Sequence, residues 1–414
     1  MYNTIITGIT SLLTDISTEM VYPLVPLYLS ILGAPPSALG LIEGLAESTA
    51  SILKVFSGWF SDRIGRRKPV AVAGYTGSIA GKLLLYASTG WGLVFAGRMV
   101  DRLGKGLRTA PRDALIADST GKGMRGRAFG LHRALDTLGA AIGVVIAILL
   151  VTNIGPHLTR SGYLRIFLVS LIPAGLGVLV LLLARERAAG RSVAGVSATR
   201  APEAGASAQE AGGVSRRYRA SRRCAASEAR PLRMFRALPV RLRWFLIVVG
   251  LFALGNSSNM FLLLRARDIG FSVVAVLSLY LLYNGVHGLL SYPAGRLADR
   301  IGKKRLLVAG YVIYGLVYVG FAFSPRVELI WVLFGVYGVY SALTEGLEKA
   351  LVADVAPDEH RGAFIGLHAT LVGIGLLPAS LLAGALWSLW GPTAPFWFGG
   401  ALGLMAALGL VFVL

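Results

Sequence analysis

The stretch GWFSDRIGRRK at Gly58–Lys68 recurs later in the chain as GRLADRIGKKR at Gly295–Arg305, with five identities in eleven positions and an offset of 237 residues. A second pair of stretches, ALIADSTGKGMRGRAFGLHRA at Ala114–Ala134 and ALVADVAPDEHRGAFIGLHAT at Ala350–Thr370, has nine identities in 21 positions at an offset of 236. Because the two offsets agree, we interpret the chain as an internal duplication. The sequence therefore predicts two similar halves.

Long apolar runs surround both copies of the repeat. Of the 414 residues 55% are hydrophobic and 15% are charged, and the mean hydropathy is +0.66, whereas a soluble domain carries about 25% charged residues. A helix that crosses a hydrocarbon core needs roughly 17 to 25 residues. Twelve apolar runs reach that length, near residues 4–32, 37–60, 70–88, 91–111, 126–152, 164–184, 244–264, 273–294, 306–324, 329–352, 363–388 and 396–414.

Six of these runs lie in each half, so both halves would enter the membrane in the same orientation. We therefore predict an all-α membrane protein with twelve transmembrane helices, arranged as two six-helix bundles related by a pseudo-twofold axis along the membrane normal. The bundles are residues 1–184 and 244–414, and residues 185–243 form a flexible basic cytoplasmic linker. The first run has no basic region before it and no cleavage site after it, which predicts a retained span.

The positive charge is distributed unevenly along the chain. With the N-terminus inside, 28 of the 41 Lys and Arg residues fall in cytoplasmic segments, eight lie within apolar runs and five lie in outer loops. Because basic loops resist translocation, this asymmetry predicts that both termini are cytoplasmic. The net charge of +20 then reflects topology and contact with anionic lipid. We expect a multi-pass protein of the cytoplasmic (inner) membrane, with no nucleic-acid partner.

Cysteine and histidine usage bears on cofactors. The single cysteine, Cys224, excludes an intramolecular disulfide and any CxxC site. His132 and His368 occupy equivalent repeat positions, and we interpret them as structural because no His and carboxylate spacing indicates a metal site. Nucleophile elbows and phosphate loops are not visible in the sequence. We expect a monomer in the lipid bilayer, with no cofactor, no metal ion and no enzymatic activity.

The repeated stretch resembles the loop signature of the major facilitator superfamily: a glycine, three residues, Asp, a basic residue, one residue, another glycine and then basic residues. The signature occurs in the equivalent loop of each half, and the resemblance covers the chain apart from the linker. It implies alternating access and secondary active transport. The matching residues are Gly58, Asp62, Arg63, Gly65, Arg66 and Arg67, and again Gly295, Asp299, Arg300, Gly302, Lys303 and Lys304.

The resemblance also implies a gate, in which Asp62 and its partners close the cytoplasmic side and separate when the bundles rock. From the residues alone, a loop that only sets topology explains the pattern too, because its glycines permit a tight turn and its basic residues contact lipid head groups. The expected gating residues are Gly58, Asp62, Arg63, Gly65, Arg66, Gly295, Asp299, Arg300 and Gly302.

Sixteen charged residues lie inside the predicted spans. Each one costs roughly 2.5 to 3.5 kcal/mol at the centre of a bilayer on insertion scales, so it tends to face a partner or a cavity. Structural ion pairing accounts for any single residue, but the whole set indicates a polar cavity. The acids are Asp15, Glu19, Glu43, Glu47, Asp101, Asp136, Glu345 and Glu348, and the bases are Lys54, Lys82, Arg98, Arg102, Lys105, Arg108, Arg133 and Lys349.

Several of these acids are predicted to lie near the midplane, where transporters bind their substrates and coupling ions. At about 1.5 Å per residue, Asp15 lies about 16 Å into the first span and Glu47 about 15 Å into the second. Glu43 and Glu47 share a helix face, and like charges at that spacing favour protonation of one member. Asp15, Glu43 and Glu47 have no base within four residues along their helices, which favours them as proton carriers unless a neighbouring helix supplies one.

The fourth span, GRMVDRLGKGLRTAPRD, resembles the superfamily's fourth-helix signature, which is linked to proton transfer, through Arg98, Gly104 and Gly106. Asp101 stands at the Gln position of that signature and Arg102 at its first Gly position. The expected proton-coupling residues are therefore Asp15, Glu43, Glu47, Arg98, Asp101 and Asp136.

Glycines and prolines shape two further spans. Gly139 and Gly143 in the fifth span resemble the superfamily's antiporter signature, with Val144 where its proline would be. Pro23 and Pro26 follow a polar face of the first span and predict a bend there.

The second half is richer in amides at depth, and amides can donate and accept hydrogen bonds without a net charge, which suits ligand recognition. Hydrogen bonding between helices is the alternative explanation. The expected substrate-binding residues are Arg102, Asn256, Asn259, Asn284 and His287.

Three functions fit these patterns. Proton-coupled efflux of small organic molecules is favoured, because acids crowd the first bundle and exporter-like glycines occur in the fifth span. Uptake of an anionic solute with protons is the alternative, since the bases of the fourth span would attract an anion. A membrane receptor or enzyme that transports nothing is the weakest alternative. In the first two cases we expect a small-molecule substrate and protons as partners.

Overall fold

The computed structural model describes residues 2–120, 124–155, 158–185, 240–323, 326–355 and 361–413, and these ranges are helical and contain no strands. The predicted linker at 185–243 falls almost entirely outside them, as does Cys224. The first half contains α1 (Tyr2–Val21), η1 (Tyr22–Leu24), α2 (Val25–Ile31), α3 (Pro36–Ile64), α4 (Lys68–Tyr86), α5 (Trp91–Asp118), α6 (Arg125–Ile154) and α7 (Arg160–Leu182). The second half contains α10 (Val240–Gly255), α11 (Met260–Asp268), α12 (Val273–Ile301), α13 (Lys303–Phe323), α14 (Val327–Val355), α15 (Arg361–Trp390) and α16 (Ala394–Val413).

The helices follow the predicted spans, and eight spans among the described residues are long and apolar enough to cross a membrane. Helices α1 to α5, which contain most of the interior charges, are not among the eight. An all-helical membrane fold is therefore confirmed, and the count of twelve crossings stays a prediction.

The signature loops are shorter than the sequence predicts. Helix α3 continues to Ile64 and ends at Gly65, whose φ of 69° is a left-handed conformation that glycine adopts without strain. The predicted loop at 61–69 is thus reduced to three residues. Beyond the predicted span at 91–111 the chain also continues as a helix, because α5 runs through Pro111 to Asp118 and includes Arg112.

The first span bends as predicted. Between α1 and α2 the chain forms the 3₁₀ turn η1, with Pro23 inside it and Pro26 in the first turn of α2. Proline has no backbone N–H to donate to the preceding turn, so the α-helical ladder is interrupted here.

The span at 244–264 is not the single helix that its hydropathy predicts. Helix α10 ends at Gly255 and α11 begins at Met260, with Asn256 to Asn259 between them. This segment has no proline, but Asn and Ser side chains offer the backbone alternative hydrogen bonds: the Ser258 hydroxyl accepts a hydrogen bond from the Met260 N–H at 3.3 Å. Both halves therefore have a broken first span.

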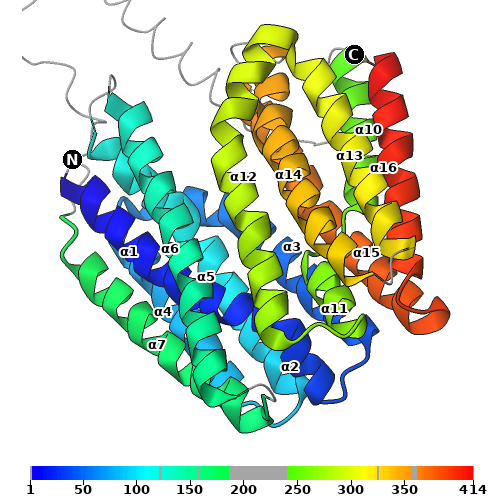
Figure 1. Ribbon diagram of the computed structural model, residues 1–414. Helices are drawn as coiled ribbons and strands as arrows, with labels where there is room; N and C mark the ends of the chain where they lie inside the picture. The colour runs from blue at the N-terminus through cyan, green and yellow to red at the C-terminus, as the bar shows by residue number, and fades with distance from the viewer. Residues whose placement is uncertain are drawn as a thin grey trace, which may run out of the picture.

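Figure 1 shows the two halves side by side as separate bundles, with both ends of the chain at the top of the view. We call this end, which holds Tyr2 and Val413, the terminal end, and the other the opposite end. Helix α3 of the first half packs against α15 of the second, and α6 packs against α12. At the bottom of Figure 1, α2 approaches α11, so the bundles also meet at the opposite end.

Small residues bring α3 and α15 together near the opposite end. A side chain at Gly384 would lie 2.8 Å from the Pro36 carbonyl oxygen, and one at Gly40 would overlap the Ser380 carbonyl oxygen. The Ser37 N–H donates to Ser388 Oγ at 3.1 Å. Backbones can approach this closely only where the side chains are small. The two halves are therefore tightly closed at the opposite end.

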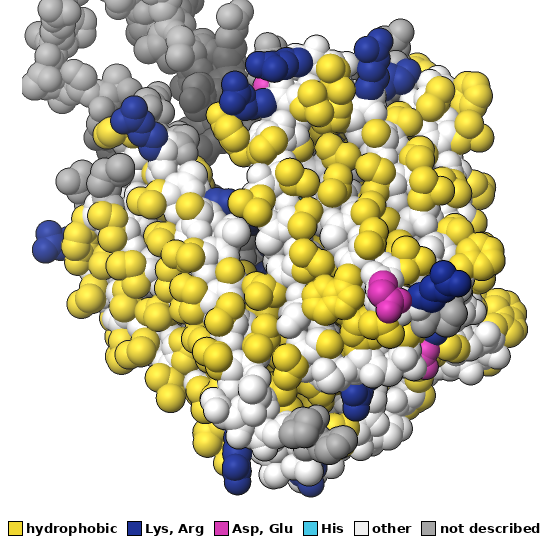
Figure 2. Space-filling model, viewed as in Figure 1, with side chains coloured by type: hydrophobic (Ala, Val, Ile, Leu, Met, Phe, Trp, Pro, Cys, Tyr) yellow, Lys and Arg dark blue, Asp and Glu magenta, His cyan; other side chains and the backbone are white. Residues whose placement is uncertain are grey.

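The surface is hollowed between the two bundles toward the terminal end, and Figure 2 shows basic side chains within this hollow. Elsewhere in that view the surface is covered largely by hydrophobic side chains. Such a continuous apolar surface is expected of a protein that is surrounded by lipid. The hollow and the closed opposite end together define the accessible face of the candidate site.

Candidate functional site

A buried ion-pair cluster joins α3 to α5 in the first half. Arg98 donates from Nη2 and Nε to Glu43 Oε1, at 2.7 and 2.8 Å. Its Nη1 lies 3.6 Å from Asp101 Oδ2, one turn along α5. The side chains of Glu43 and Arg98 are 0% and 2% exposed. An uncompensated charge at such a position is very unfavourable, so the pair is held together strongly.

A second pair lies one turn further along both helices. Arg102 Nε lies 2.9 Å from Glu47 Oε1. The guanidinium carbons of Arg98 and Arg102 lie 5.5 and 5.7 Å from the ring centre of Tyr22. The sequence shows no base near Glu43 or Glu47 on their own helix and leaves open a base from a neighbouring helix; in the structure α5 supplies an arginine to each.

Asp15 and Glu19 differ from these paired acids. Within the described residues the Asp15 carboxylate has no hydrogen-bond or ion-pair partner, and its charged neighbours are Asp136, Glu19, Arg108 and Lys105. Glu19 accepts a hydrogen bond of 2.8 Å from the hydroxyl of Tyr280, which belongs to the other half. Both acids are half-buried.

Close packing of α1 on α6 holds Asp15 in place. Side chains at Gly139 and Gly143 would lie 2.5 Å from the carbonyl oxygens of Leu12 and Ile16. These two glycines thus permit the backbone of α6 to reach the stretch of α1 that carries Asp15.

Further basic groups surround the same stretch of α1. Lys82 of α4 donates to Ser17 Oγ at 2.6 Å and to Thr18 Oγ1 at 3.2 Å. Arg112 of α5 donates to Ser11 Oγ at 2.9 Å. Lys105 is exposed and has no ion-pair partner within the described residues. Helix α1 is therefore bordered by cations on its α4 and α5 sides.

Asp136 lies on α6 with His132, whose Nδ1 is 3.4 Å from Asp136 Oδ2. Arg133 lies one turn before Asp136 on the same helix, at a spacing that would allow the two to pair. Arg133 instead points across to the second half, where its Nη2 lies 3.9 Å from Glu345 Oε1.

The predicted substrate-binding amides have mixed surroundings. Asn259 accepts a hydrogen bond of 2.8 Å from Tyr337, and its amide group donates to Tyr283 at 3.4 Å. Asn256 donates to Tyr340 at 3.3 Å. Asn284 donates to a carbonyl of its own helix at 3.0 Å. Their roles in binding stay predictions, as does that of Arg102, which is paired with Glu47.

Tyrosines around these amides were not singled out from the sequence. Tyr280, Tyr283 and Tyr337 form a continuous aromatic wall, with ring centres 6.0 and 5.2 Å apart. Tyr22 of the first half lies 5.8 Å from Tyr280. The ring of His287 stacks on Tyr283 at 6.2 Å, and its Nε2 lies 3.1 Å from Glu345 Oε2. The spacing of Tyr280, Tyr283 and His287, by three and four residues, is the helical pattern that could have revealed one face.

The predicted gating residues lie at the terminal end. Arg63 is exposed and lies over the ring of Trp59 at 5.3 Å, and a side chain at Gly58 would touch Ala110 at 3.3 Å. Arg66 is exposed. The side chain of Asp62 lies outside what the structure describes.

The second signature is arranged similarly. Asp299 and Arg300 are exposed on the last turn of α12, and Gly302 ends that helix with a φ of 97°. Gly295 has open space around it. The gating role of these residues and of their counterparts in the first half stays a prediction.

A basic residue of each signature is paired within its own half. Arg67 Nη1 lies 2.9 Å from Asp118 Oδ2 at the end of α5, and Lys303 Nζ lies 2.6 Å from Asp354 Oδ2 at the end of α14. Asp118 and Asp354 are identical residues in the second matched pair of stretches, so the duplication itself could have identified them.

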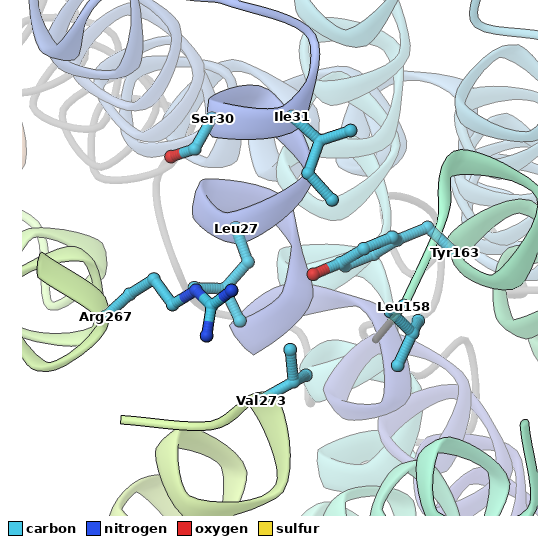
Figure 3. A pocket seen from close by; sticks show the side chains of 7 residues that line it. All are labelled: Leu27, Ser30, Ile31, Leu158, Tyr163, Arg267 and Val273. Carbon is cyan, nitrogen blue, oxygen red and sulfur yellow. The ribbon is translucent and has the colours of Figure 1, made fainter. Parts of the chain in front are cut away.

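A pocket of about 320 Å³ lies at the opposite end, where α2 and α7 of the first half meet α11 and α12 of the second. Figure 3 shows the Arg267 guanidinium and the Tyr163 hydroxyl directed into it between Leu27, Leu158 and Val273. Because both halves line it, this pocket exists only while the opposite end is closed. Among the described residues, no group of three or more His, Cys, Asp or Glu side chains could hold a metal ion.

Known proteins resemble this chain over nearly its whole length. An MFS-type transporter of Methanocaldococcus jannaschii is 33% identical over 99% of this chain and 94% of its own length. The multidrug resistance protein MdtH of Yersinia pestis is 24% identical over 97% and 91%.

Solved structures show the same fold at low identity. The nucleoside transporter NupG superposes with a TM-score of 0.78 at 13% identity, covering 99% of both chains. A D-xylose-proton symporter superposes with a TM-score of 0.73 at 17% identity, covering 98% of this chain and 96% of its own. The sequence model of the Major Facilitator Superfamily matches residues 7–286 and 244–414. The chain therefore belongs to the major facilitator superfamily and is a membrane transporter.

Proposed function

We propose that this transporter exports a small organic molecule in exchange for protons, with Asp15 as the carboxylate that carries the proton. The observation that supports this role is the contrast among the midplane acids of the first half. Glu43 and Glu47 are each held by an arginine, whereas Asp15 has no such partner within the described residues and is half-buried. An acid that is not bound to a fixed counter-charge can gain or lose a proton without breaking an ion pair.

Alternating access gives Asp15 its coupling role. With the termini in the cytoplasm, as the loop charges predict, the structure is inward-facing, because the opposite end is closed and the hollow faces the terminal end. In this state Asp15 releases its proton to the cytoplasm and is left as an anion beside Lys105 and Arg108. When the bundles rock, Asp15 faces the external medium and takes up a proton there.

Export direction has two supports. The α1–α6 contact is built on Gly139 and Gly143, the pair that resembles the antiporter signature. The relative from Yersinia pestis is named as a multidrug resistance protein. The aromatic wall of Tyr280, Tyr283 and Tyr337 offers an apolar surface for an organic solute, and Asn259 offers it an amide.

Uptake of an anionic solute with protons is the second candidate. Lys105 favours it, because this exposed cation has no ion-pair partner within the described residues. The arginines of α5 argue against it, since Glu43 and Glu47 already neutralise Arg98 and Arg102.

Purified protein in liposomes tests both candidates. A pH gradient is imposed in either direction, and a panel of organic cations, neutral solutes and anions is assayed for accumulation. Export predicts accumulation in the more acidic compartment, whereas symport predicts accumulation in the more alkaline one. Equal transport with and without the gradient would refute proton coupling.

Variants then assign the proton. We expect Asp15→Asn to abolish uphill accumulation while leaving downhill exchange intact, because a permanently neutral side chain mimics the protonated state. The matched control is Glu47→Gln, which should impair both modes because it leaves Arg102 without its acid. Uphill transport at the wild-type rate by Asp15→Asn would remove this residue from the coupling mechanism.

A further inference from the structure

We propose that Tyr311, Glu348 and His368 form a second proton-binding site, located in the second half and separate from Asp15. The site goes beyond the proposed export function, since it binds a proton whether or not a substrate is present. Three helices contribute to it: α13 supplies the tyrosine, α14 the glutamate and α15 the histidine.

The Glu348 carboxylate is held by one hydrogen bond on each oxygen. Tyr311 donates its hydroxyl to Oε1 at 2.8 Å, and His368 Nε2 lies 3.1 Å from Oε2. The side chains of His368 and Glu348 are 3% and 12% exposed, so the glutamate retains limited contact with water. A carboxylate only accepts hydrogen bonds, so Nε2 of the imidazole must carry the hydrogen in this arrangement.

The other ring nitrogen of His368 can accept the proton. Its Nδ1 is buried and has no hydrogen-bond partner among the residues that the structure describes. With the hydrogen on Nε2, Nδ1 of the neutral ring bears a lone pair. Adding a proton to Nδ1 converts the imidazole into an imidazolium and changes the net charge of the cluster from −1 to 0. The adjacent carboxylate stabilises that imidazolium, and no other bond has to form or break.

The internal duplication relates this cluster to three residues of the first half. At an offset of 236 residues, the positions of Tyr311, Glu348 and His368 correspond to Tyr75, Arg112 and His132. The tyrosine and the histidine are thus kept, and the glutamate is replaced by an arginine that bonds to Ser11. In the first half the carboxylate beside the histidine is Asp136, one turn along the same helix, whereas in the second half it is Glu348 of α14, which also accepts the hydrogen bond from Tyr311.

The residues around the cluster leave the change of charge to Glu348 and His368. The ring of Phe252 from α10 stacks on Tyr311 at 3.9 Å between ring centres, which shields that side from water. Tyr340 interacts electrostatically with Glu348, and Glu345 and Lys349 are its charged neighbours along α14. Helix α10, which supplies Phe252, also carries Arg243, and Arg243 has an interaction of its own. Glu345 is bound by His287.

Nitrogen-15 NMR of histidine-labelled protein in lipid nanodiscs tests the proposal. The chain has five histidines, and the signals of His368 are identified by their loss in His368→Gln. Between about pH 9 and about pH 5, the range over which histidine can change charge, Nδ1 of His368 should change from unprotonated to protonated.

Two variants should move the proton affinity of His368 in opposite directions. Glu348→Gln removes the anion and should lower this affinity at least tenfold. Tyr311→Phe keeps the stacked ring and removes a donor to the carboxylate, so it should raise the affinity. The matched control is His132→Gln in the first half, which should leave the His368 titration unchanged. A His368 that stays neutral throughout, or that titrates identically in both variants, would overturn the proposal. The measurement needs no substrate, so a failure of the export hypothesis would not affect it.

Discussion

The α3–α15 contact should set the balance between the two conformations of the transporter, and Gly40→Ala tests it. In the closed opposite end, a Cβ at this position would overlap the carbonyl oxygen of Ser380. Helix α15 would have to move away, because the obstacle is backbone and not a flexible side chain. The clash exists only while α3 and α15 are in contact, and the outward-facing state relieves it.

The size of the effect follows from the cost of overpacking. An added methyl group in a tight contact costs about 1 to 3 kcal/mol, and a free-energy difference of that size changes an equilibrium by about 5- to 150-fold. We expect Gly40→Ala to shift the population toward the state with an open opposite end by a factor within this range. Gly384→Ala should act in the same direction, because its Cβ would lie 2.8 Å from the Pro36 carbonyl oxygen.

Spin-label distances provide the assay. After removal of Cys224, one pair of labels is placed at the opposite end, at Thr159 and Leu389, and another at the terminal end, at Arg66 and Arg300; all four sites are exposed. The variant should lengthen the first distance and shorten the second. Gly366→Ala on α15, where a Cβ meets open space, is the matched control and should change neither. A folded Gly40→Ala protein with wild-type distance distributions would refute the reasoning.

Three further predictions concern the ion pairs and the topology. Glu43→Gln should lower the free energy of unfolding by about 3 kcal/mol, the lower end of the range for breaking a buried ion pair. The loss is at the lower end because Asp101 stays 3.6 Å from Arg98 and compensates its charge in part. An unchanged denaturation midpoint would contradict this. Helices α5 and α14 carry opposite charges at the repeat-related positions Asp113 and Lys349. Asp113→Lys should therefore hinder closure of the terminal end, and adding Lys349→Asp in the double variant should restore it. The terminal-end spin-label distance measures both effects. Cys224 should resist an impermeant thiol reagent in whole cells and react after permeabilisation; labelling in intact cells would reverse the predicted orientation.

Hydropathy predicted most of the fold because membrane crossing requires long apolar helices, and the length of each apolar run can be counted in the sequence. It was less informative where a helix continues into a polar segment. The predicted span at 91–111 ends just before Arg112, yet α5 continues past this residue to Asp118. The two breaks in the first spans also differ in visibility. Pro23 and Pro26 predict the break between α1 and α2, whereas the segment Asn256 to Asn259 contains no residue that forbids a helix.

The candidate site was harder to predict, because a helical sequence pattern reveals only contacts between residues three or four positions apart on the same helix. Counting bases along each helix left Glu43 and Glu47 without a partner, although α5 places Arg98 and Arg102 beside them. The same limitation separated Glu348 from Tyr311 and His368, which come from two other helices. Alignment of the two halves carries part of the missing information, since it relates positions that occupy equivalent places in the two bundles.

The alignment also indicates how the two halves divide the chemistry. In the first half, most of the deep charge is neutralised inside one bundle, so Glu43 with Arg98 and Glu47 with Arg102 can move as rigid units when that bundle rocks. The second half presents tyrosines and amides, which can bind a solute without a fixed charge. Across the interface, Glu19 is bonded to Tyr280. The protonation that we propose at Asp15, one turn from Glu19, would change the field at the point where the halves touch, where it could influence both the solute and the rocking motion.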